Sequence, residues 1–461
     1  MIKVDTSLKK DLLPRHIQLM AIAGMIGTGI FNGSSETVSL AGPSVIFAYL
    51  LGGALLLVIM ASIAELAVVY PNSGIQTILL KAFGFKISFV VGWIYWINWT
   101  IVTTVEIIAA GSFLQYWFPS LPLWLLSLIC GLTIFIVNCI SVKYYGEIEF
   151  WFGGIKIATL LIFSILGATI LFGFFTDHTV DPLANYTSQG GFFPNGWHGM
   201  FSALLVIMFS YGGSELIGVS ITETRDAEKV VPKIVKGVVW RVVLFYVLPV
   251  TIICGLIPWN EVANSTKSPF VQVFSLVGLP GAAGIMNFVL LTAVLSAANA
   301  GIYATSRTVF TLAKNGEAPK LFTHISKKGV PVNALILSGI WVVLGVILSY
   351  ITPDKVFNYL MSIPGITVLL NWMSICLAQV KLRPHYPKQP YFKVWLSPYL
   401  NFFTVFILAI IFVFFITNED NIVGTIVSCI IIISLSITAV IIEKKHKKFN
   451  VEPKQERKIN T

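Results

Sequence analysis

The stretch AIAGMIGTGIFNG at residues 21–33 carries four glycines inside a long apolar run. Glycine in a helix interior costs about 1 kcal/mol relative to alanine, so a helix that only crossed a bilayer would not concentrate glycines at its middle. Backbone that leaves the helix inside a membrane is tolerated only where protein or water covers it. A second interruption, FSYGGSE, follows at residues 209–215. Two interrupted spans at matching places in two halves are typical of the binding site of a secondary transporter.

The composition places the chain among integral membrane proteins. Of its 461 residues, 56% are hydrophobic and 11% are charged, and the mean hydropathy is +0.83. Apolar runs of about 20 residues, the length that crosses a bilayer, recur along the chain, and they do not alternate as the strands of a membrane barrel do. We therefore predict an all-α integral membrane protein with twelve transmembrane helices. The twelve runs cover residues 17–42, 44–69, 88–117, 123–142, 149–175, 199–221, 237–258, 281–312, 334–352, 356–380, 397–417 and 422–442.

The formal charge of +10 follows the predicted topology. With the N-terminus inside, the threading places every Lys and Arg on the inner side except Lys156, Lys267 and Lys355. This bias is what the positive-inside rule predicts for a multi-pass protein of the cell membrane with both termini in the cytoplasm. The basic charge therefore does not indicate a nucleic-acid partner.

The two interruptions fall in the first and the sixth predicted spans, which indicates a repeat of five spans. An odd repeat length inverts the second copy relative to the membrane, and inverted repeats are common in transporters. We predict a 5+5 inverted-repeat fold with helices 1 and 6 broken. The predicted parts are a cytoplasmic tail at 1–16, a transport core at 17–380, helices 11 and 12 at 381–443, and a cytoplasmic tail at 444–461.

Cysteine and histidine provide no sign of metal or catalytic chemistry. All five cysteines fall within apolar runs without metal-ligand spacing, and we interpret them as small buried hydrophobic residues. The six histidines form no paired motif. We predict no metal, no cofactor and no enzymatic activity.

Two ionisable residues are predicted to lie deep in spans, where such residues generally serve function. Glu106 lies near the centre of the third span, with no basic residue close in sequence. We interpret it as a candidate proton carrier, and the alternative is a structural carboxylate bonded to opened backbone. Lys156 lies in the fifth span. We interpret it as a second proton-coupling candidate, whose ammonium group takes the place of a coupling cation and can lose its proton. The alternative is a side chain that extends to the inner surface.

Two further glutamates adjoin spans. Glu215 follows the second interruption directly, so its carboxylate either caps free backbone N–H groups or pairs with a substrate amine. Glu65 lies towards the inner end of the second span, where a gate or a loop contact is the simpler interpretation. Arg225, Arg241 and Arg307 are expected at the inner face, in structural or gating roles.

The interrupted helices supply complementary polar groups. Free N–H groups of Gly27, Thr28 and Gly29, at the start of a half-helix, suit a carboxylate. Free carbonyls of Phe209, Ser210 and Tyr211 suit an ammonium group. Together the two sets predict a site for a zwitterion such as the backbone of an α-amino acid.

Longer motifs then permit a comparison with a family. They are GMIGTGIFNGS (24–34), ELAVVYPNSG (65–74), GWIYWINW (92–99), SVKYYGEIEFWFGGIK (141–156), FSYGGSELIGVSITETRDAEKVVPKIVK (209–236), WRVVLFY (240–246) and SAANAGIYATSRTVFTLAKNGEAP (296–319). Through these motifs, spread over spans one to eight, the chain resembles bacterial members of the amino acid transporter family within the amino acid–polyamine–organocation superfamily. The resemblance implies a leucine-transporter-type fold, alternating access and proton-coupled uptake of amino acids.

The resemblance also assigns roles to residues. It implies that residues 27–29 bind the substrate carboxylate and residues 209–211 its amine, and that Glu106 matches an acidic residue of relatives. It implies that Lys156 replaces a second sodium site, beside the inner end of span eight where Thr305 and Ser306 lie. The chain departs from the pattern of many relatives after the first interruption and in span ten, so the resemblance does not identify the substrate side chain.

Other functions remain as alternatives. An exchanger or a sodium-coupled symporter would share the fold. A nutrient sensor derived from a transporter commonly carries longer tails, and an intramembrane enzyme would need a nucleophile–base pair or a metal set that the sequence does not display. Proton-coupled import of an L-amino acid across the lipid bilayer is the function predicted.

Overall fold

The computed structural model describes residues 16, 19, 24–31, 33–140, 142–174, 181–265, 268–276, 281–351, 356–417 and 422–451. Every regular element within these ranges is a helix, as predicted. The main helices are α3 (Gly33–Ala41), α4 (Val45–Val69), α6 (Phe85–Gln115), α7 (Leu123–Ile140), α8 (Val142–Leu171), α10 (Gly196–Ser210), α14 (Leu248–Leu256), α17 (Ala282–Lys314), α18 (Val332–Ile351), α19 (Val356–Leu382), α20 (Tyr399–Thr417) and α21 (Ile422–Val451). Shorter helices and helical turns are α2 (Thr28–Phe31), η1 (Gly42–Ser44), α5 (Ile75–Phe83), α9 (Pro182–Thr187), α11 (Leu216–Ser220), η2 (Ile221–Glu223), α12 (Ala227–Lys236), α13 (Val238–Val242), η3 (Val243–Val247), α15 (Trp259–Asn264), α16 (Pro269–Leu276), η4 (Lys320–Thr323) and η5 (Arg383–His385).

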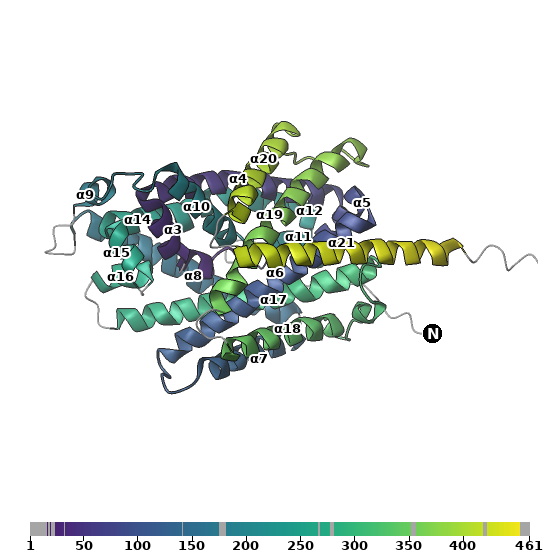
Figure 1. Cartoon of the computed structure of the whole chain (residues 1–461), viewed down its shortest axis with the longest axis horizontal. Coiled ribbons are helices and arrows are strands. Elements are labelled where there is room, and N and C mark those ends of the chain that lie inside the picture. Colours follow the sequence, from purple (N-terminus) through teal and green to yellow (C-terminus); the bar gives the residue numbers. More distant parts are fainter. Residues whose placement is uncertain are drawn as a thin grey trace, which may run out of the picture.

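Two long helices, α6 and α17, lie side by side through the middle of the molecule (Figure 1). Helices α7 and α18 pack along one side of this pair, while α3, α4, α10 and α14 lie on the other side. A glycine allows the central pair to approach closely, because a Cβ at Gly301 would lie only 2.0 Å from Thr103 Oγ1. Small residues are the usual means of close helix packing in a membrane. The short helices α2 and α11 both contact α17, so the central pair supports the segments beside them.

The outer surface and the helix lengths fit a membrane. Large apolar side chains point outward on the peripheral helices, for example Ile136 on α7 and Phe406 on α20, which are 59% and 61% exposed. An apolar surface of this extent needs a hydrocarbon environment. Within the described residues, ten helical stretches are long and apolar enough to cross a membrane, two fewer than predicted. The difference arises because Gly33–Val69 counts as one stretch of 37 residues, and because Gly196–Ser210 is apolar but shorter than a span.

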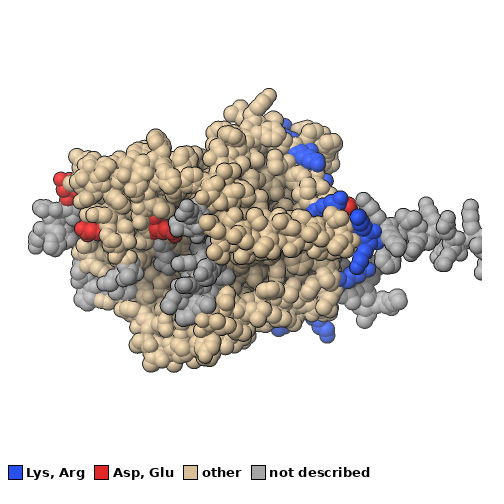
Figure 2. Space-filling view, viewed as in Figure 1, with Lys and Arg blue, Asp and Glu red and all other residues tan. Residues whose placement is uncertain are grey.

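Charged residues gather at the two ends of the long axis (Figure 2). Lys and Arg lie over the end where α5 and α21 finish, and most of the acidic residues visible on this face lie towards the other end. At the basic end, Lys86 Nζ lies 3.4 Å from Glu443 Oε2 and links the start of α6 to α21. A wide band without charges separates the two ends on this face.

The two predicted tails and both predicted outer lysines lie wholly or partly outside the described residues. The predicted tail at 1–16 lies outside the described residues except for His16. Helix α21 continues to Val451, beyond the predicted start of the C-terminal tail, and the rest of that tail lies outside the described residues. Lys267 and Lys355, predicted on the outer side, also lie outside them.

The cysteines are only partly as predicted. Cys130, Cys254 and Cys376 are buried and Cys139 is partly buried, but Cys429 is exposed. The interpretation of Cys429 as a buried residue was wrong, because α21 lies at the periphery and turns much of its surface away from the protein.

Candidate functional site

The two interruptions predicted from the sequence lie against each other. Non-helical residues 24–27 precede α2, and a turn at residues 211–215 separates α10 from α11. Ser210 Oγ donates a hydrogen bond to the Gly29 carbonyl at 2.8 Å. A Cβ at Gly29 would lie 2.6 Å from Ser210 Cα, so the close approach requires glycine. The segments therefore form one unit although about 180 residues separate them in sequence.

A second glycine has the same role on the other segment. Gly213 has a φ of +98°, and a Cβ there would lie 2.2 Å from the Gly24 carbonyl oxygen. A side chain at this position would be both strained and obstructed.

Tyr246 joins the two segments from a third element. Its hydroxyl lies 2.5 Å from the Met25 carbonyl oxygen and 3.0 Å from the Ser210 carbonyl oxygen. Tyr246 belongs to η3, a π-helical turn in which the backbone is wider than in an α-helix. The single hydroxyl proton serves two carbonyls, one from each interrupted segment.

Glu106 reaches the first interruption from α6. Thr28 donates to its Oε1 through the hydroxyl group at 2.8 Å and through the backbone N–H at 3.4 Å. The Glu106 side chain is buried, and its Oε2 accepts no hydrogen bond from any residue that the structure describes. Glu106 also lines a small cavity, and one of its two carboxyl oxygens has no hydrogen-bond donor among the residues described.

A cavity of about 30 Å³ lies between these elements. Its wall consists of residues from the two segments, four of them glycines, together with residues of α6, α17 and α19. The lining residues are Gly24, Met25, Gly27, Gly29, Asn98, Trp99, Val102, Glu106, Phe209, Ser210, Gly212, Ala297 and Val368. A cavity of this volume holds about two water molecules.

Some predicted ligand residues line this cavity and others do not. Gly27, Gly29, Phe209 and Ser210 belong to its wall, and Thr28 contacts the wall through Glu106. Tyr211 is buried elsewhere and donates its hydroxyl proton to the Tyr49 carbonyl at 2.8 Å.

Glu215 also lies away from the cavity wall. It accepts hydrogen bonds from the Gly213 N–H at 3.2 Å and from Trp372 Nε1 at 3.3 Å. This geometry corresponds to the capping interpretation of Glu215, in which the carboxylate satisfies opened backbone.

The carbonyls predicted as free already accept hydrogen bonds. The Phe209 carbonyl accepts from the Gly212 N–H at 2.9 Å, and the Ser210 carbonyl accepts from Tyr246. The Tyr211 carbonyl accepts from the Ser214 N–H at 3.5 Å. Each carbonyl oxygen retains a second lone pair. An ammonium group would therefore add to these contacts.

Lys156 is fully buried on α8 and interacts electrostatically with Glu149 and, more weakly, with Glu106. Glu149 was not selected from the sequence. Its Oε1 accepts from Ser296 Oγ at 2.7 Å and its Oε2 from Asn299 Nδ2 at 3.3 Å, both on α17. The available signal was the seven-residue spacing from Glu149 to Lys156, which places both on one face of a helix.

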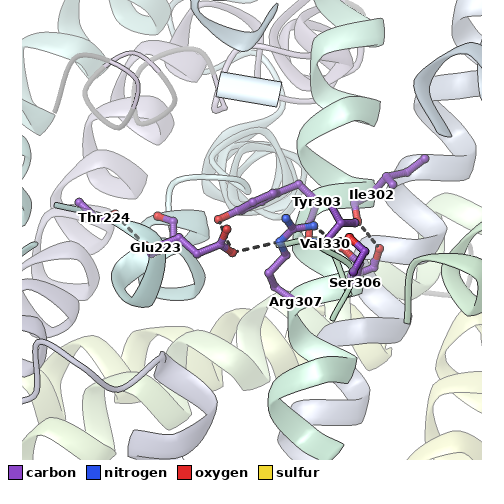
Figure 3. A network of polar contacts seen from close by, with 10 residues as sticks. Glu223, Thr224, Ile302, Tyr303, Ser306, Arg307 and Val330 are labelled. Carbon is purple, nitrogen blue, oxygen red and sulfur yellow. Dashed lines mark hydrogen bonds and ion pairs between the residues drawn. The ribbon is translucent and has the colours of Figure 1, made fainter. Parts of the chain in front are cut away.

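A buried ion pair lies near the C-terminal end of α17 (Figure 3). Arg307 Nε donates to Glu223 Oε1 at 3.0 Å, and the Tyr303 hydroxyl donates to the same oxygen at 3.1 Å. The Arg307 guanidinium lies 4.4 Å from the centre of the Tyr303 ring, which stacks on Tyr145 at 4.2 Å. The pair fastens η2 to α17.

Thr305 and Ser306 lie beside this ion pair. The Thr305 hydroxyl lies 3.0 Å from the Gly301 carbonyl oxygen, on its own helix. The Ser306 hydroxyl donates to the Tyr303 carbonyl at 2.9 Å and accepts from Arg307 at 3.0 Å. Both hydroxyl groups are therefore engaged with α17 itself.

Glu65 contacts a loop, as the simpler interpretation expected. Gln379 Nε2 donates to its Oε1 at 2.8 Å, and the Val394 backbone N–H donates to its Oε2 at 2.5 Å. Arg383 Nε lies 3.4 Å from Oε1. The carboxylate thus joins α4 to α19 and to the segment that precedes α20.

A multi-pass helical bundle that surrounds two abutting interrupted segments and a half-bonded carboxyl group has the features of a membrane transporter for a small molecule. The comparisons with known proteins agree. The chain belongs to the amino acid permease family, whose sequence model matches residues 16–455. It is accordingly a transporter and not an enzyme.

Individual relatives are similar over nearly their whole length. The uncharacterized amino acid permease YvbW of Bacillus subtilis (strain 168) is 42% identical over 444 residues, covering 96% of this chain and 99% of the relative. The gamma-aminobutyric acid permease of the same organism is 40% identical over 406 residues, covering 87% and 86%. The uncharacterized transporter YdgF, from the same organism, is 37% identical over 446 residues, covering 96% and 97%.

Proposed function

We propose that this chain imports an L-amino acid together with protons by alternating access. The observation that carries the proposal is the contact between the two interrupted segments, made by Ser210 on Gly29 and bridged by Tyr246, with the Glu106 carboxyl group in the same cavity wall. Backbone groups of both polarities next to a titratable side chain suit a zwitterionic substrate and a coupled proton. Exchange and sodium coupling are the competing modes for the same fold.

The proposed architecture has twelve spans in a 5+5 inverted repeat with two further helices. The stretch Gly33–Val69 supports two spans, because 37 helical residues would extend about 55 Å, far more than the hydrocarbon core of about 30 Å. The turn η1, where Gly42 has a φ of +59°, is the proposed boundary. Helices α10 and α11, interrupted at residues 211–215, are proposed to form the sixth span together. The basic end of the molecule is proposed to face the cytoplasm, with both termini.

In this proposal the substrate carboxylate meets the backbone at residues 27–29, and the substrate amine meets the carbonyls of residues 209–211. Thr28 supports the first assignment, because its backbone N–H already donates to a carboxyl oxygen, Glu106 Oε1, at 3.4 Å. A substrate carboxylate at this place would replace Glu106 as the acceptor, or would accept a hydrogen bond from Glu106 when Glu106 is protonated. Glu215 serves as the cap of the second segment.

Purified protein in proteoliposomes tests the function directly. Radiolabelled uptake is measured across the protein amino acids and γ-aminobutyrate, with an inward proton gradient, an inward sodium gradient, or internal unlabelled substrate. We expect accumulation driven by the proton gradient and independent of sodium. Uptake that requires sodium, or that requires internal substrate, would instead establish a competing mode.

The carboxylate assignment has a separate test. Methyl esters of the transported amino acid lack the negative charge and should fail to compete, and Gly27→Val should abolish binding in protein that still inserts. Full competition by an ester would reject the assignment. The ester result is the cleaner one, because a valine side chain in place of Gly27 would also press on Glu106.

A further inference from the structure

A buried ammonium group and two buried carboxyl groups interact electrostatically in the middle of the bundle. Glu149 and Lys156 lie two helical turns apart on α8 and project from the same face. Lys156 interacts electrostatically with Glu149 and with Glu106 of α6. All three side chains are buried.

The two carboxyl groups differ in their hydrogen-bond donors. Glu149 receives a donor on each oxygen, Ser296 at 2.7 Å and Asn299 at 3.3 Å. Glu106 receives both of its contacts on Oε1, from Thr28, and its Oε2 receives none from the residues described. Donors on both oxygens stabilise a carboxylate, so Glu149 is the better-held anion of the two.

The Asn299 amide is oriented for this purpose. Asn138 Nδ2 on α7 donates to Asn299 Oδ1 at 2.8 Å, so the Asn299 amide nitrogen is the group that faces Glu149. The donor is therefore fixed by a second helix and does not depend on the substrate cavity.

The charges do not balance if every group is ionised. Two carboxylates and one ammonium would leave one negative charge in an apolar interior, where an uncompensated charge is costly. A proton on one carboxyl group removes this cost. The donor pattern favours a proton on Glu106 over a proton on Glu149.

We propose that Glu149 is a positioning residue of the proton-coupling site: it stays ionised and holds the Lys156 ammonium, and thereby leaves Glu106 as the carboxyl group that gains and loses the coupled proton. The inference rests on the proposed proton coupling. Among the residues described, the charged and titratable groups that interact with Glu149 are Lys156 and Tyr145 of α8. Beyond Lys156 lies Glu106 of α6, and beyond Tyr145 lie Tyr303 and Arg307 of α17 and Glu223 of η2.

The test compares Glu149→Gln with Glu149→Asp in proteoliposomes. Gln keeps the size and loses the charge, whereas Asp keeps the charge and loses one methylene. Without the Glu149 charge, Lys156 pairs with Glu106 and the site no longer retains the extra proton. We expect Glu149→Gln to move the pH profile of uptake lower by about one pH unit, a tenfold change in proton concentration, and to lose gradient-driven accumulation. Exchange between internal and external substrate should persist, because it needs no net proton movement.

Glu149→Asp should keep a profile closer to that of the unaltered protein. A role in shape alone would give the reverse order, with Gln milder than Asp, and would overturn the proposal. Glu147→Gln is the matched control, since this residue lies on the same helix with its side chain partly exposed and 3.2 Å from His16. Its profile should not move.

Ser296→Ala supplies a second variant if Glu149→Gln does not fold. It removes the closest donor and leaves the charge, so the profile should move in the same direction by a smaller amount. An unchanged profile in both variants, in protein whose uptake is driven by protons, would reject the role of Glu149 alone. Uptake by the unaltered protein that ignores the proton gradient would reject the proposed function itself.

Discussion

Two buried carboxyl groups of this permease have opposite surroundings. Glu223, near the C-terminal end of α17, receives an arginine and a tyrosine on one oxygen. Glu106, beside the interrupted segments, receives only Thr28 and has no arginine in contact among the residues described. In both groups Oε2 accepts no hydrogen bond from the residues described, so the difference is the arginine. A buried carboxylate bonded to an arginine holds two elements in one arrangement, whereas one bonded only to a threonine can change its protonation without breaking the bundle. We infer that the first region fastens helices and that the second responds to protonation.

The largest loss of stability is expected when the ion pair between Glu223 and Arg307 is broken. Arg307→Met leaves the Glu223 carboxylate buried without its cation, and removal of one partner of such a pair costs about 3–5 kcal/mol of unfolding free energy. Thermal unfolding of the purified variant in detergent measures the loss. The double variant Glu223→Gln/Arg307→Met should regain most of the stability, because neither charge remains. A double variant as unstable as the single one would show that Arg307 acts through packing.

The next effect concerns the contact between the segments. Gly29→Ala places a Cβ 2.6 Å from Ser210 Cα, and the backbone must shift to relieve it. We expect a loss of about 1–3 kcal/mol in stability, typical of overpacking, with loss of substrate binding. Gly154→Ala on α8 is the control, since a Cβ there meets nothing within 4 Å. Normal substrate binding by Gly29→Ala would show that the close contact between Gly29 and Ser210 is not needed for binding.

The protein should remain nearly as stable when the Glu106 side chain can no longer carry a charge. Glu106→Gln keeps an acceptor for Thr28, so its unfolding free energy should change by about 1 kcal/mol or less. Accumulation driven by a proton gradient should nevertheless disappear, while substrate binding persists. The same change at the ion pair, Glu223→Gln, should have the opposite effects. It should reduce stability and leave proton-driven accumulation by the folded protein in place. Proton-driven accumulation by Glu106→Gln would exclude Glu106 from coupling.

The smallest effect is expected from Tyr246→Phe. The ring remains, but the Met25 and Ser210 carbonyls lose a shared donor, at a cost of about 0.5–1.5 kcal/mol. Tyr186→Phe removes a similar hydroxyl contact, to the Thr251 carbonyl, away from the cavity. Both variants should lose similar stability, but only Tyr246→Phe should weaken transport. Equal transport in the two would show that the bridge is structural.

Apolar periodicity was sufficient to predict the membrane class. Glycine placement indicated the two segments in which residues 24–27 and 211–215 are not helical, while the twelve-span count and the broken spans stay predictions. The predicted third span at 88–117 and eighth span at 281–312 agree within a few residues with α6 and α17. The short helices between spans were not predicted, although α12 carries apolar residues at helical spacing. Their stability depends on packing against helices such as α4, which a single sequence does not reveal.

The missed site residues have a common physical cause. The apolar run that defines the fifth span begins at residue 149, so Glu149 looked like a residue at the membrane boundary. Helix α8 begins at Val142, which puts Glu149 two turns inside a helix where Ser296 and Asn299 satisfy it. Glu223 was missed for a similar reason, since its partner Arg307 lies 84 residues away. Polar pairs between distant helices leave no local signal.

The wide turn at η3 makes the number of residues in its span a structural requirement. A regular α-helix rotates by about 100° per residue, and the π turn holds one residue more than an α turn. Deletion of a single residue from 243–247 would let the helix run on regularly, but it would swing Tyr246 a quarter turn or more away from the Met25 and Ser210 carbonyls. Over evolutionary time, this span should accept exchanges of residue type more readily than any insertion or deletion.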